Sequence, residues 1–197
     1  MAASSLSFLF RSLIGAGAVT AATMWAVRTF AEHSSGSGTQ PIATQWGFVA
    51  DRVMGGLSTG SVEHAHIDGQ DAMQLRGNVS LENDGGFIQM ATDLGPEGAL
   101  LDATAFTGIE IDVFGNDETY ELRLRTDDLT RPWQSYRHVF TAEPVWLTLR
   151  IPFAELEPYR TDAPFDPARL RRLGVVAVGR AFEAEVAVAG LRLYRNR

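Results

Sequence analysis

From residue 45 onward, apolar residues recur mainly at every second position, the spacing of β-strands whose alternate side chains point to opposite faces of a sheet. Ile109, Ile111 and Val113, for example, alternate with Glu110 and Asp112. Similar alternation or apolar runs predict further strands near 45–50, 60–66, 72–80, 86–92, 120–124, 145–151, 175–179 and 186–194. Turn signals separate these segments, and only the short stretch 167–173 looks helical. About eight to ten strands without intervening helices predict an all-β fold, a jelly-roll-like antiparallel β-sandwich.

The first 31 residues form a separate segment that contains no acidic side chain. Residues 6–27 are apolar or small apart from Arg11 and a few hydroxyls, and as a helix they would be about 33 Å long. That length spans a bilayer core of about 30 Å. Gly15, Ala18 and Ala22 would place small residues on the helix surface, where another transmembrane helix can approach closely. An N-terminal transmembrane or signal helix is therefore expected.

The sequence predicts three parts: a membrane anchor or targeting segment at 1–31, a flexible linker at 32–44, and the β-sandwich domain at 45–197. A retained anchor, a cleaved secretory signal and a mitochondrial transit peptide all fit the first part. The residues before position 32 match a cleavage site poorly, which favours a retained anchor. The arginine-only basic composition and the short tail favour a bacterial inner membrane, with the mitochondrial inner membrane as the alternative.

Composition excludes several classes of function. All 17 basic residues are arginine, so Schiff-base and Walker-type lysines are absent. The chain has no cysteine, which excludes disulfides, thiolate nucleophiles and zinc–thiolate sites. Its net charge of -7 argues against general nucleic-acid binding. Together with the lack of a coherent histidine-centred cluster, these absences lead us to expect no enzyme activity, no cofactor and no metal.

Two polar loops each carry a pair of glycines beside a large apolar residue and a carboxylate. Gly55 and Gly56 lie in the first loop, and Gly85 and Gly86 lie in the second. Paired glycines allow backbone angles that other residues resist, so positive φ angles are expected in both loops, with Met54 and Phe87 turned into the sandwich. Neither loop matches a phosphate-binding loop or a nucleophile elbow.

The order of these landmarks resembles the complex I intermediate-associated protein family, whose domain begins with a Trp, an Asp-x-Val-Met-Gly-Gly-x-Ser turn and an Asn-x-Gly-Gly-Phe turn. Here the two turns are carried by Trp46, Asp51, Val53, Met54, Gly55, Gly56, Ser58, Glu82, Asn83, Gly85, Gly86 and Phe87. The resemblance covers residues 45–195. It implies a galactose-binding-like β-sandwich and a role in the assembly of a membrane complex, with no catalytic residue in the motif.

Two other polar clusters offer candidate chemistry. His64 and His66 lie two apart on an expected strand and so point to one face, but no third nitrogen ligand is near them in the sequence. An exposed strand face explains them without a metal. The basic run Arg169–Arg172 would suit lipid headgroups or an acidic partner, and a solvated helix face is the simpler interpretation.

Two pairs of carboxylates are candidates for acid–base catalysis of glycoside hydrolysis: Asp51 with Glu82, and Asp127 with Asp128. Acidic residues beside glycine turns more often accept hydrogen bonds from the backbone of the loop. We therefore expect these carboxylates to have a structural role.

Aromatic residues are the candidate contacts. Trp133, Tyr136 and Trp146, with Tyr120 on an edge-like strand, would suit either stacking against sugars or anchoring a protein partner. Trp146 alternates out of phase with the apolar residues around it, so it is exposed or lies under a second layer. Trp133, Tyr136 and Trp146 are the expected partner contacts.

Together these features predict a non-catalytic, membrane-tethered assembly factor or accessory subunit. Its partners are expected to be subunits of a large membrane protein complex, respiratory complex I or a related complex, with neither nucleic acid nor a small-molecule substrate. The alternative is an exported carbohydrate-binding module.

Overall fold

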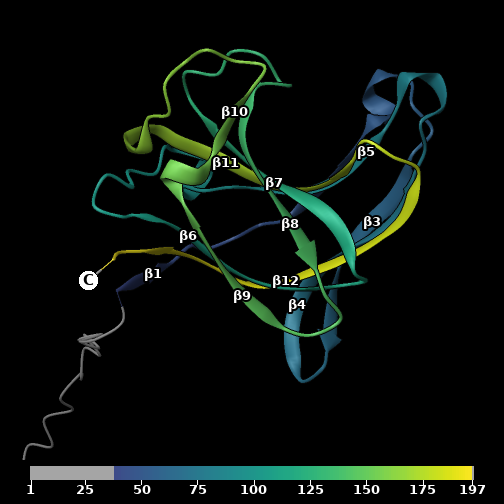
Figure 1. Ribbon diagram of the computed structural model, residues 1–197, viewed down its shortest axis with the longest axis horizontal. Coiled ribbons are helices and arrows are strands. Elements are labelled where there is room, and N and C mark those ends of the chain that lie inside the picture. The colour runs from purple at the N-terminus through teal and green to yellow at the C-terminus, as the bar shows by residue number, and fades with distance from the viewer. Residues whose placement is uncertain (1–37, 197) are drawn as a thin grey trace, which may run out of the picture. The chain divides into compact units, whose positions relative to one another are not determined.

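Two antiparallel sheets lie face to face in the computed structural model, which describes residues 38–196 (Figure 1). Sheet A has the order β3 (Thr59–Ile67), β4 (Gln70–Val79), β12 (Phe182–Tyr194), β6 (Gly108–Gly115) and β9 (Leu147–Pro152), and β1 (Thr39–Pro41) also pairs with β12. Sheet B has the order β10 (Glu157–Tyr159), β8 (Ser135–Ala142), β7 (Glu118–Thr126), β11 (Leu170–Val178), β5 (Phe87–Asp93) and β2 (Gly47–Ala50). The helical turns are η1 (Asp51–Met54), η2 (Glu82–Asp84), η3 (Pro96–Gly98), η4 (Phe153–Glu155) and η5 (Pro167–Arg169). The predicted all-β antiparallel sandwich is confirmed.

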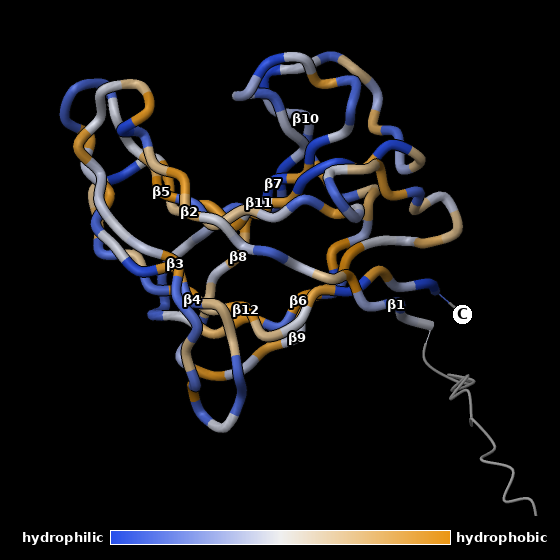
Figure 2. The backbone as a smooth tube through the Cα atoms, turned by 180° about the vertical axis from the view of Figure 1, so that it is seen from behind, coloured by the Kyte–Doolittle hydropathy of each residue, from blue (hydrophilic) through white to orange (hydrophobic). Residues whose placement is uncertain are grey.

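The core lies between the sheets and follows from the alternation. Ile109, Ile111 and Val113 on β6 and Leu122 and Leu124 on β7 are fully buried. Burying a side chain of this kind contributes about 1.5–3 kcal/mol relative to leaving it exposed. Figure 2 shows apolar segments along the strands of both sheets and polar segments at the hairpin turns.

The long strand β12 has a different neighbour beside each half. Residues 182–188 pair with β4, and residues 192–194 pair with β1. The backbone N–H of Ile42 continues this ladder to the carbonyl oxygen of Leu191 at 2.9 Å. The predicted flexible linker at 32–44 is therefore wrong for residues 39–41, because the free edge of β12 gives that segment hydrogen-bond partners that no local pattern reveals.

The helical expectation at 167–173 is correct only for residues 167–169. Asp166 accepts a hydrogen bond from the backbone N–H of Ala168, which starts a helical turn, but η5 ends at Arg169. From Leu170 the chain runs as β11, which pairs with β5 on one side and with β7 on the other. The hydrogen bonds of two strand ladders outweigh those of one short helix, and isolated short helices are marginal in water.

The described chain has twelve strands rather than eight to ten. Among the strands not predicted is β8, where Arg137 and His138 interrupt the apolar pattern. Tyr120 lies on β7, which has β8 and β11 as neighbours, so the expected edge-like position of Tyr120 is wrong.

The predicted anchor at 1–31, with Gly15, Ala18 and Ala22, lies outside the described residues. Within residues 38–196, no helix is long and apolar enough to cross a membrane.

Candidate functional site

A buried carboxylate joins the two glycine loops. Asp51 follows β2 directly, and its side chain is fully buried. It accepts hydrogen bonds from the backbone N–H of Ser58 at 3.1 Å, Gly86 at 2.7 Å and Phe87 at 3.2 Å, and from the hydroxyl of Ser58. Because these donors come from both loops, one side chain holds together segments about 35 residues apart. The prediction that Asp51 has a structural role is confirmed.

The same contacts determine the charge state of Asp51. Burial alone raises the pKa of a carboxyl because it disfavours the charged form. In Asp51 the hydrogen bonds from Ser58, Gly86 and Phe87 outweigh burial, and they hold the pKa of Asp51 below its ordinary value. Asp51 is therefore an anion at neutral pH, and backbone dipoles rather than an arginine stabilise it.

The four glycines fit this arrangement in two ways. Gly55 and Gly86 have φ angles of 94° and 135°, so the expected positive φ in each loop is confirmed. Gly56 and Gly85 instead leave room for the carboxylate. A Cβ atom would lie 2.4 Å from Asp51 at Gly56 and 2.6 Å from it at Gly85. Each loop thus has one glycine for its backbone angle and one for the close approach of Asp51.

The apolar residues of these loops point to solvent. Val53, Met54 and Leu81 are 77%, 66% and 52% exposed, whereas Phe87 is half-buried. The expected inward turn of Met54 is therefore wrong, because the carboxylate of Asp51 lies beneath the loop. The expected inward turn of Phe87 is also wrong, because strand alternation directs its neighbour Ile88 into the core and Phe87 to the outer face. The joined loops present an exposed apolar surface, which we call the apolar tip and define as Val53, Met54 and Leu81.

The apolar tip forms one wall of a groove of about 1120 Å³ over the outer face of sheet B. The opposite wall contains Leu129, Trp133 and Arg160. In Figure 1 these walls belong to the two raised lobes on either side of β5, β7 and β11. The floor is made by residues of β5 and β11, including Gln89, Ala91, Gly174, Val176 and Val178.

The groove has a basic end and an apolar end. Across the strands, Arg172 on β11 is opposite Arg125 on β7 and Asp93 on β5, whereas Val178 is opposite Phe87. The six residue steps from 172 to 178 correspond to about 20 Å along a strand. The polarity of the groove therefore follows the direction of β11.

Arg125 at the basic end has no carboxylate partner among the described residues. Its guanidinium donates to the carbonyl oxygens of Leu129 at 2.9 Å, Arg131 at 2.9 Å and Pro132 at 2.6 Å. Burial, followed by the neighbouring charges of Arg171 and Arg172, lowers the pKa of Arg125 from its ordinary value. Arg125 remains charged and holds the loop that carries Trp133.

The Tyr159 ring at this end is surrounded by cations. The guanidinium carbons of Arg123, Arg137 and Arg160 lie 4.8, 4.8 and 5.3 Å from its centroid. Cation–π contacts of this kind use the electron-rich face of the ring, so Tyr159 offers little free surface for stacking.

Comparison with known proteins places these loops in a family. The sequence profile described as Complex I intermediate-associated protein 30 (CIA30) matches residues 35–186. The chain belongs to the CIA30 family. The joined loops around Asp51 and all the residues that line the groove lie within the matched region. No curated protein matches the chain.

Solved structures similar to this CIA30 domain are carbohydrate-binding modules. A family 11 module of a cellulosomal cellulase from Clostridium thermocellum has a TM-score of 0.66 at 14% identity, covering 82% of this chain and 97% of that one. The same type of module, in complex with a β-1,3-1,4-mixed-linked tetrasaccharide, has a TM-score of 0.64 at 13% identity, covering 82% and 98%. A family 30 module of another cellulosomal cellulase from Clostridium thermocellum has a TM-score of 0.56 at 17% identity, covering 80% and 94%. These likenesses show the fold.

The remaining motif residues of the CIA30 domain support the loops. Ser58 is buried, and its hydroxyl also accepts the N–H of Ser80 at 2.9 Å. The side-chain amide of Asn83 reaches the carbonyl oxygen of Gly55 at 3.5 Å, so it also links the loops. Trp46 is half-buried against the core, and Glu82 is exposed.

The predicted partner contacts do not lie together. Trp133 is 49% exposed on the groove wall. Tyr136 is fully buried, its ring packs on Phe165 and its hydroxyl donates toward the carbonyl oxygens of Ala163 and Pro164, so its predicted contact role is wrong. β8 directs Tyr136 into the core.

Trp146 covers sheet A. It is half-buried, its ring lies 5.5 Å from that of Phe114, and its indole N–H donates to the carbonyl oxygen of Ile67 at 2.9 Å. Trp146 therefore lies on the opposite side of the sandwich from the groove floor.

The other candidate chemistries find no site. His66 is exposed and lies 2.9 Å from Asp71, and residues 38–196 contain no group of three potential metal ligands. Arg169 pairs with both Asp127 and Asp128 at 2.9 and 2.7 Å, which ties these carboxylates to the basic run. In the other candidate pair, Asp51 already accepts hydrogen bonds from its own loops, whereas Glu82 is exposed.

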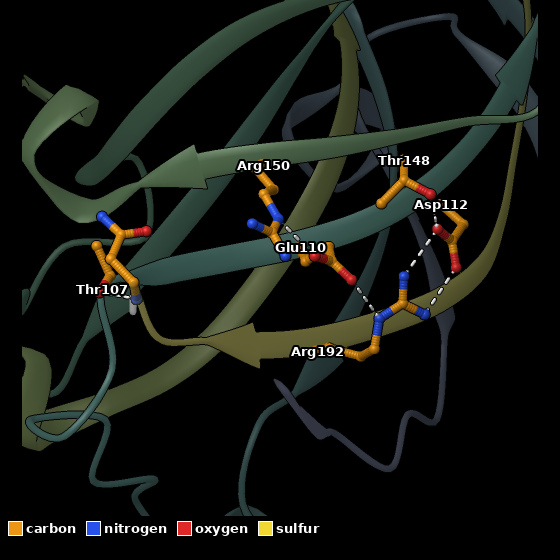
Figure 3. A network of polar contacts seen from close by, with 7 residues as sticks. Thr107, Glu110, Asp112, Thr148, Arg150 and Arg192 are labelled. Carbon is orange, nitrogen blue, oxygen red and sulfur yellow. Dashed lines mark hydrogen bonds and ion pairs between the residues drawn. The ribbon is translucent and has the colours of Figure 1, made fainter. Parts of the chain in front are cut away.

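The outer face of sheet A has a network of paired charges, shown in Figure 3. Arg192 on β12 binds Glu110 at 2.8 Å and Asp112 at 2.7 and 2.8 Å. Arg150 on β9 binds the other oxygen of Glu110 at 2.7 Å. Burial raises the pKa of both carboxyls, but these hydrogen bonds outweigh it and lower the pKa of Glu110 and of Asp112.

The basic end of the groove was not identified as a site from the sequence. One signal was available, because Arg123 and Arg125 alternate with Leu122 and Leu124 and so share the outer face of β7. Only the pairing of β7 with β11 adds Arg172 to them.

Proposed function

We propose that this protein is a non-catalytic assembly factor or accessory subunit of respiratory complex I or a related membrane complex, and that it docks through the groove over sheet B. Membership of the CIA30 family supports the association with complex I. The observation that carries the docking surface is the clustering of Val53, Met54, Leu81 and Trp133 around this groove, each 49% or more exposed. Clustered exposed apolar side chains on a folded domain mark interaction sites.

The non-catalytic role is supported by the occupation of the candidate carboxylates. Asp51 accepts hydrogen bonds from its own loops, and Asp127 and Asp128 pair with Arg169. The chain also contains no lysine or cysteine for covalent catalysis. A docking protein needs only a shaped surface, and this arrangement supplies one.

We further propose that residues 1–31 tether the domain to a membrane, the bacterial inner membrane or, as the alternative, the mitochondrial inner membrane. The support is the acid-free apolar stretch at 6–27. A tether raises the local concentration of the domain near a membrane partner. Alkaline carbonate extraction of membranes tests it: the protein should stay in the pellet, and a soluble form that begins near Glu32 would contradict the tether.

The docking proposal is tested with the full chain and detergent-solubilised membranes. The variant Met54→Ser with Trp133→Ala removes apolar surface from both walls of the groove. Truncating an exposed tryptophan that anchors an interface commonly costs about 2 kcal/mol or more, so co-purification of complex I subunits should fall at least about tenfold. The control is Val145→Ala, an apolar residue 48% exposed outside the groove. Equal recovery with both variants would contradict docking through the groove.

Carbohydrate binding is the second candidate, because the similar structures are carbohydrate-binding modules and the groove wall holds the exposed Trp133. The cations around Tyr159 weigh against a row of stacking rings. Isothermal titration of the full chain with a mixed-linked β-glucan tetrasaccharide tests this candidate. Micromolar binding that Trp133→Ala abolishes would favour it over docking.

A further inference from the structure

We infer that the groove over sheet B binds an extended segment of a partner protein that has carboxylates at one end and large apolar side chains at the other. This inference rests on the proposed docking function and deepens it by naming the chemistry of the bound segment. It follows from the charge of the groove, the shape of its floor and the direction in which its polarity runs.

The charge of the groove is opposite to that of the whole chain. Five arginines and two aspartates line it, in a protein whose net charge is -7. Two of the arginines are already paired, Arg123 with Glu121 at 2.7 Å and Arg171 with Asp127 at 3.1 Å, and the other three carry the free positive charge. One of the aspartates, Asp84, belongs to the motif loop at the far end from Arg172. An acidic chain with a basic groove attracts anionic groups to that groove and repels them elsewhere.

Two arginines at the basic end are available to a ligand. Arg160 is exposed and has no carboxylate partner within the described part of the chain. The side chain of Arg172 is 42% exposed, and its contact with Asp93 is long, at 3.5 Å. Guanidinium groups bind carboxylates through paired hydrogen bonds, so both side chains suit aspartate or glutamate.

The middle of the floor combines small side chains with two longer polar ones. Gly174 on β11 is directly opposite Ala91 on β5, and Val176 follows on the same face of β11. Two longer side chains flank these positions, Gln89 on β5 and Arg123 on β7. The Gln89 amide oxygen lies 3.1 Å from where a Cβ of Gly174 would be, so a bound segment would meet this amide in the middle of the floor. Beyond them, Val178 and Phe87 lead to the apolar tip.

The distance between the two ends sets the length of the segment. Residues 172 and 178 are about 20 Å apart along β11, which equals about six residues of an extended chain. A segment with carboxylates at one end and apolar side chains six residues away would reach Arg172 and the apolar tip together. A neutral sugar chain has neither kind of group, and the cations around Tyr159 leave little free ring for it.

The test measures fluorescence anisotropy of labelled ten-residue peptides with the full chain. The main probe carries three acidic residues, a Gly–Ser spacer of four residues and three Leu or Phe residues. One comparison probe has arginines in place of the acids, and the other has serines in place of the apolar residues. The wild-type protein should bind the main probe at least about tenfold more tightly than either comparison probe, because each comparison probe lacks the groups that one end of the groove binds.

Charge reversal then tests whether the acidic residues of the probe bind at the basic end of the groove. The variant Arg160→Glu with Arg172→Glu should bind the main probe about tenfold more weakly and should bind the arginine probe better than the wild type does. The matched control is Arg76→Glu, an exposed arginine of β4 that pairs with Glu185 on sheet A. Its effect should stay within about twofold. Circular dichroism of each variant confirms that the domain is folded.

Three results would overturn the inference: similar affinity for all three probes, no binding of any of them, or equal effects of the groove variant and of Arg76→Glu. Failure here is distinct from failure of the proposed function. If complex I subunits co-purify with the wild type and with the charge-reversed variant alike, the docking function stands and the groove chemistry is wrong. If no complex co-purifies with the wild type, the proposed function itself fails.

Discussion

The outer faces of the two sheets differ in how far their charges are paired. On sheet A, Arg192 binds both Glu110 and Asp112, and Arg150 binds Glu110 as well (Figure 3). On sheet B, Arg125 is satisfied only by backbone carbonyl oxygens within its own part of the chain, and its charge is not neutralised there. On sheet B, Arg123 and Arg171 are paired with carboxylates. Arg125 and Arg160 have no carboxylate partner within residues 38–196, and they lie at a groove that also holds exposed apolar groups.

A glycine leaves room for a polar side chain both on sheet A and in the loop beside sheet B. A Cβ on Gly190 of sheet A would lie 2.6 Å from Arg192 and from Asp112, and a Cβ on Gly56 would lie 2.4 Å from Asp51. On sheet A the space is used to pair two side chains, whereas beside sheet B it is used to join two loops. The joined loops form a wall of the groove, so the buried charge near sheet B serves the shape of a surface.

The largest effect is expected from Asp51→Ala, which removes the side chain that joins the two glycine loops beside sheet B. The change leaves the backbone N–H groups of Gly86, Phe87 and Ser58 without their acceptor in a buried site. The free energy of unfolding should fall by about 3 kcal/mol or more. Urea denaturation of the full chain measures it. A loss below about 1 kcal/mol would show that water or the loops themselves satisfy these donors.

Gly56→Val should lower the free energy of unfolding somewhat less, by about 2–3 kcal/mol, because the new side chain overlaps the carboxylate of Asp51. The matched control is Gly69→Val in the β3–β4 turn, where φ is 81° and nothing lies within 4 Å of a Cβ. There only backbone strain remains, about 1–2 kcal/mol. The same denaturation experiment compares them, and equal losses would mean that the contact with Asp51 does not matter.

Arg192→Met tests the charge network on the outer face of sheet A. The free energy of unfolding should fall by about 2 kcal/mol, less than for a fully buried pair, because the side chain of Arg192 is 23% exposed. The change leaves Glu110 with only Arg150 and Asp112 with only Thr148. Peptide probes for the groove should bind this variant as they bind the wild type. A change in probe affinity would show that the two faces are coupled.

The smallest effect concerns pH. Because the pKa of Asp51 is lower in the folded chain than its unfolded value of about 3.9, the unfolded state binds more protons in this range. The stabilisation is therefore complete above that value and is lost as pH falls through the folded pKa. Asp51→Asn should be less stable than the wild type at pH 7, and the difference should shrink as pH falls below about 4. Parallel pH curves would contradict an ionised Asp51.

Much of the fold was predictable because strand alternation is local. The alternation of Ile109, Ile111 and Val113 with Glu110 and Asp112 correctly predicts which side chains of β6 face the core. The strand β1 and the start of β11 were not predicted, because their hydrogen-bond partners lie far away along the chain. Tyr136 was assigned to the surface because its strand was not recognised.

The candidate site was also predicted from the sequence only in part. The motif loops, their glycines and the structural role of Asp51 were recognised from residue types and short spacing. The direction of Met54 was predicted wrongly, because the space under the loop is taken by a carboxylate that also binds the second loop. The groove was not predicted, since its arginines come from strands that meet only in the sheet.

The sequence by itself determined the all-β class, the inward face of most predicted strands, the absence of lysine and cysteine chemistry, and the family of the loops. These follow from composition and from patterns a few residues long, which do not depend on distant contacts. Only the tertiary structure decided that Asp51 joins two loops, that sheet A neutralises its own charges, and that Arg172 lies beside Arg125 at one end of a groove. Each of these depends on the pairing of segments that are distant in the chain, and a single sequence carries no local signal of such pairing.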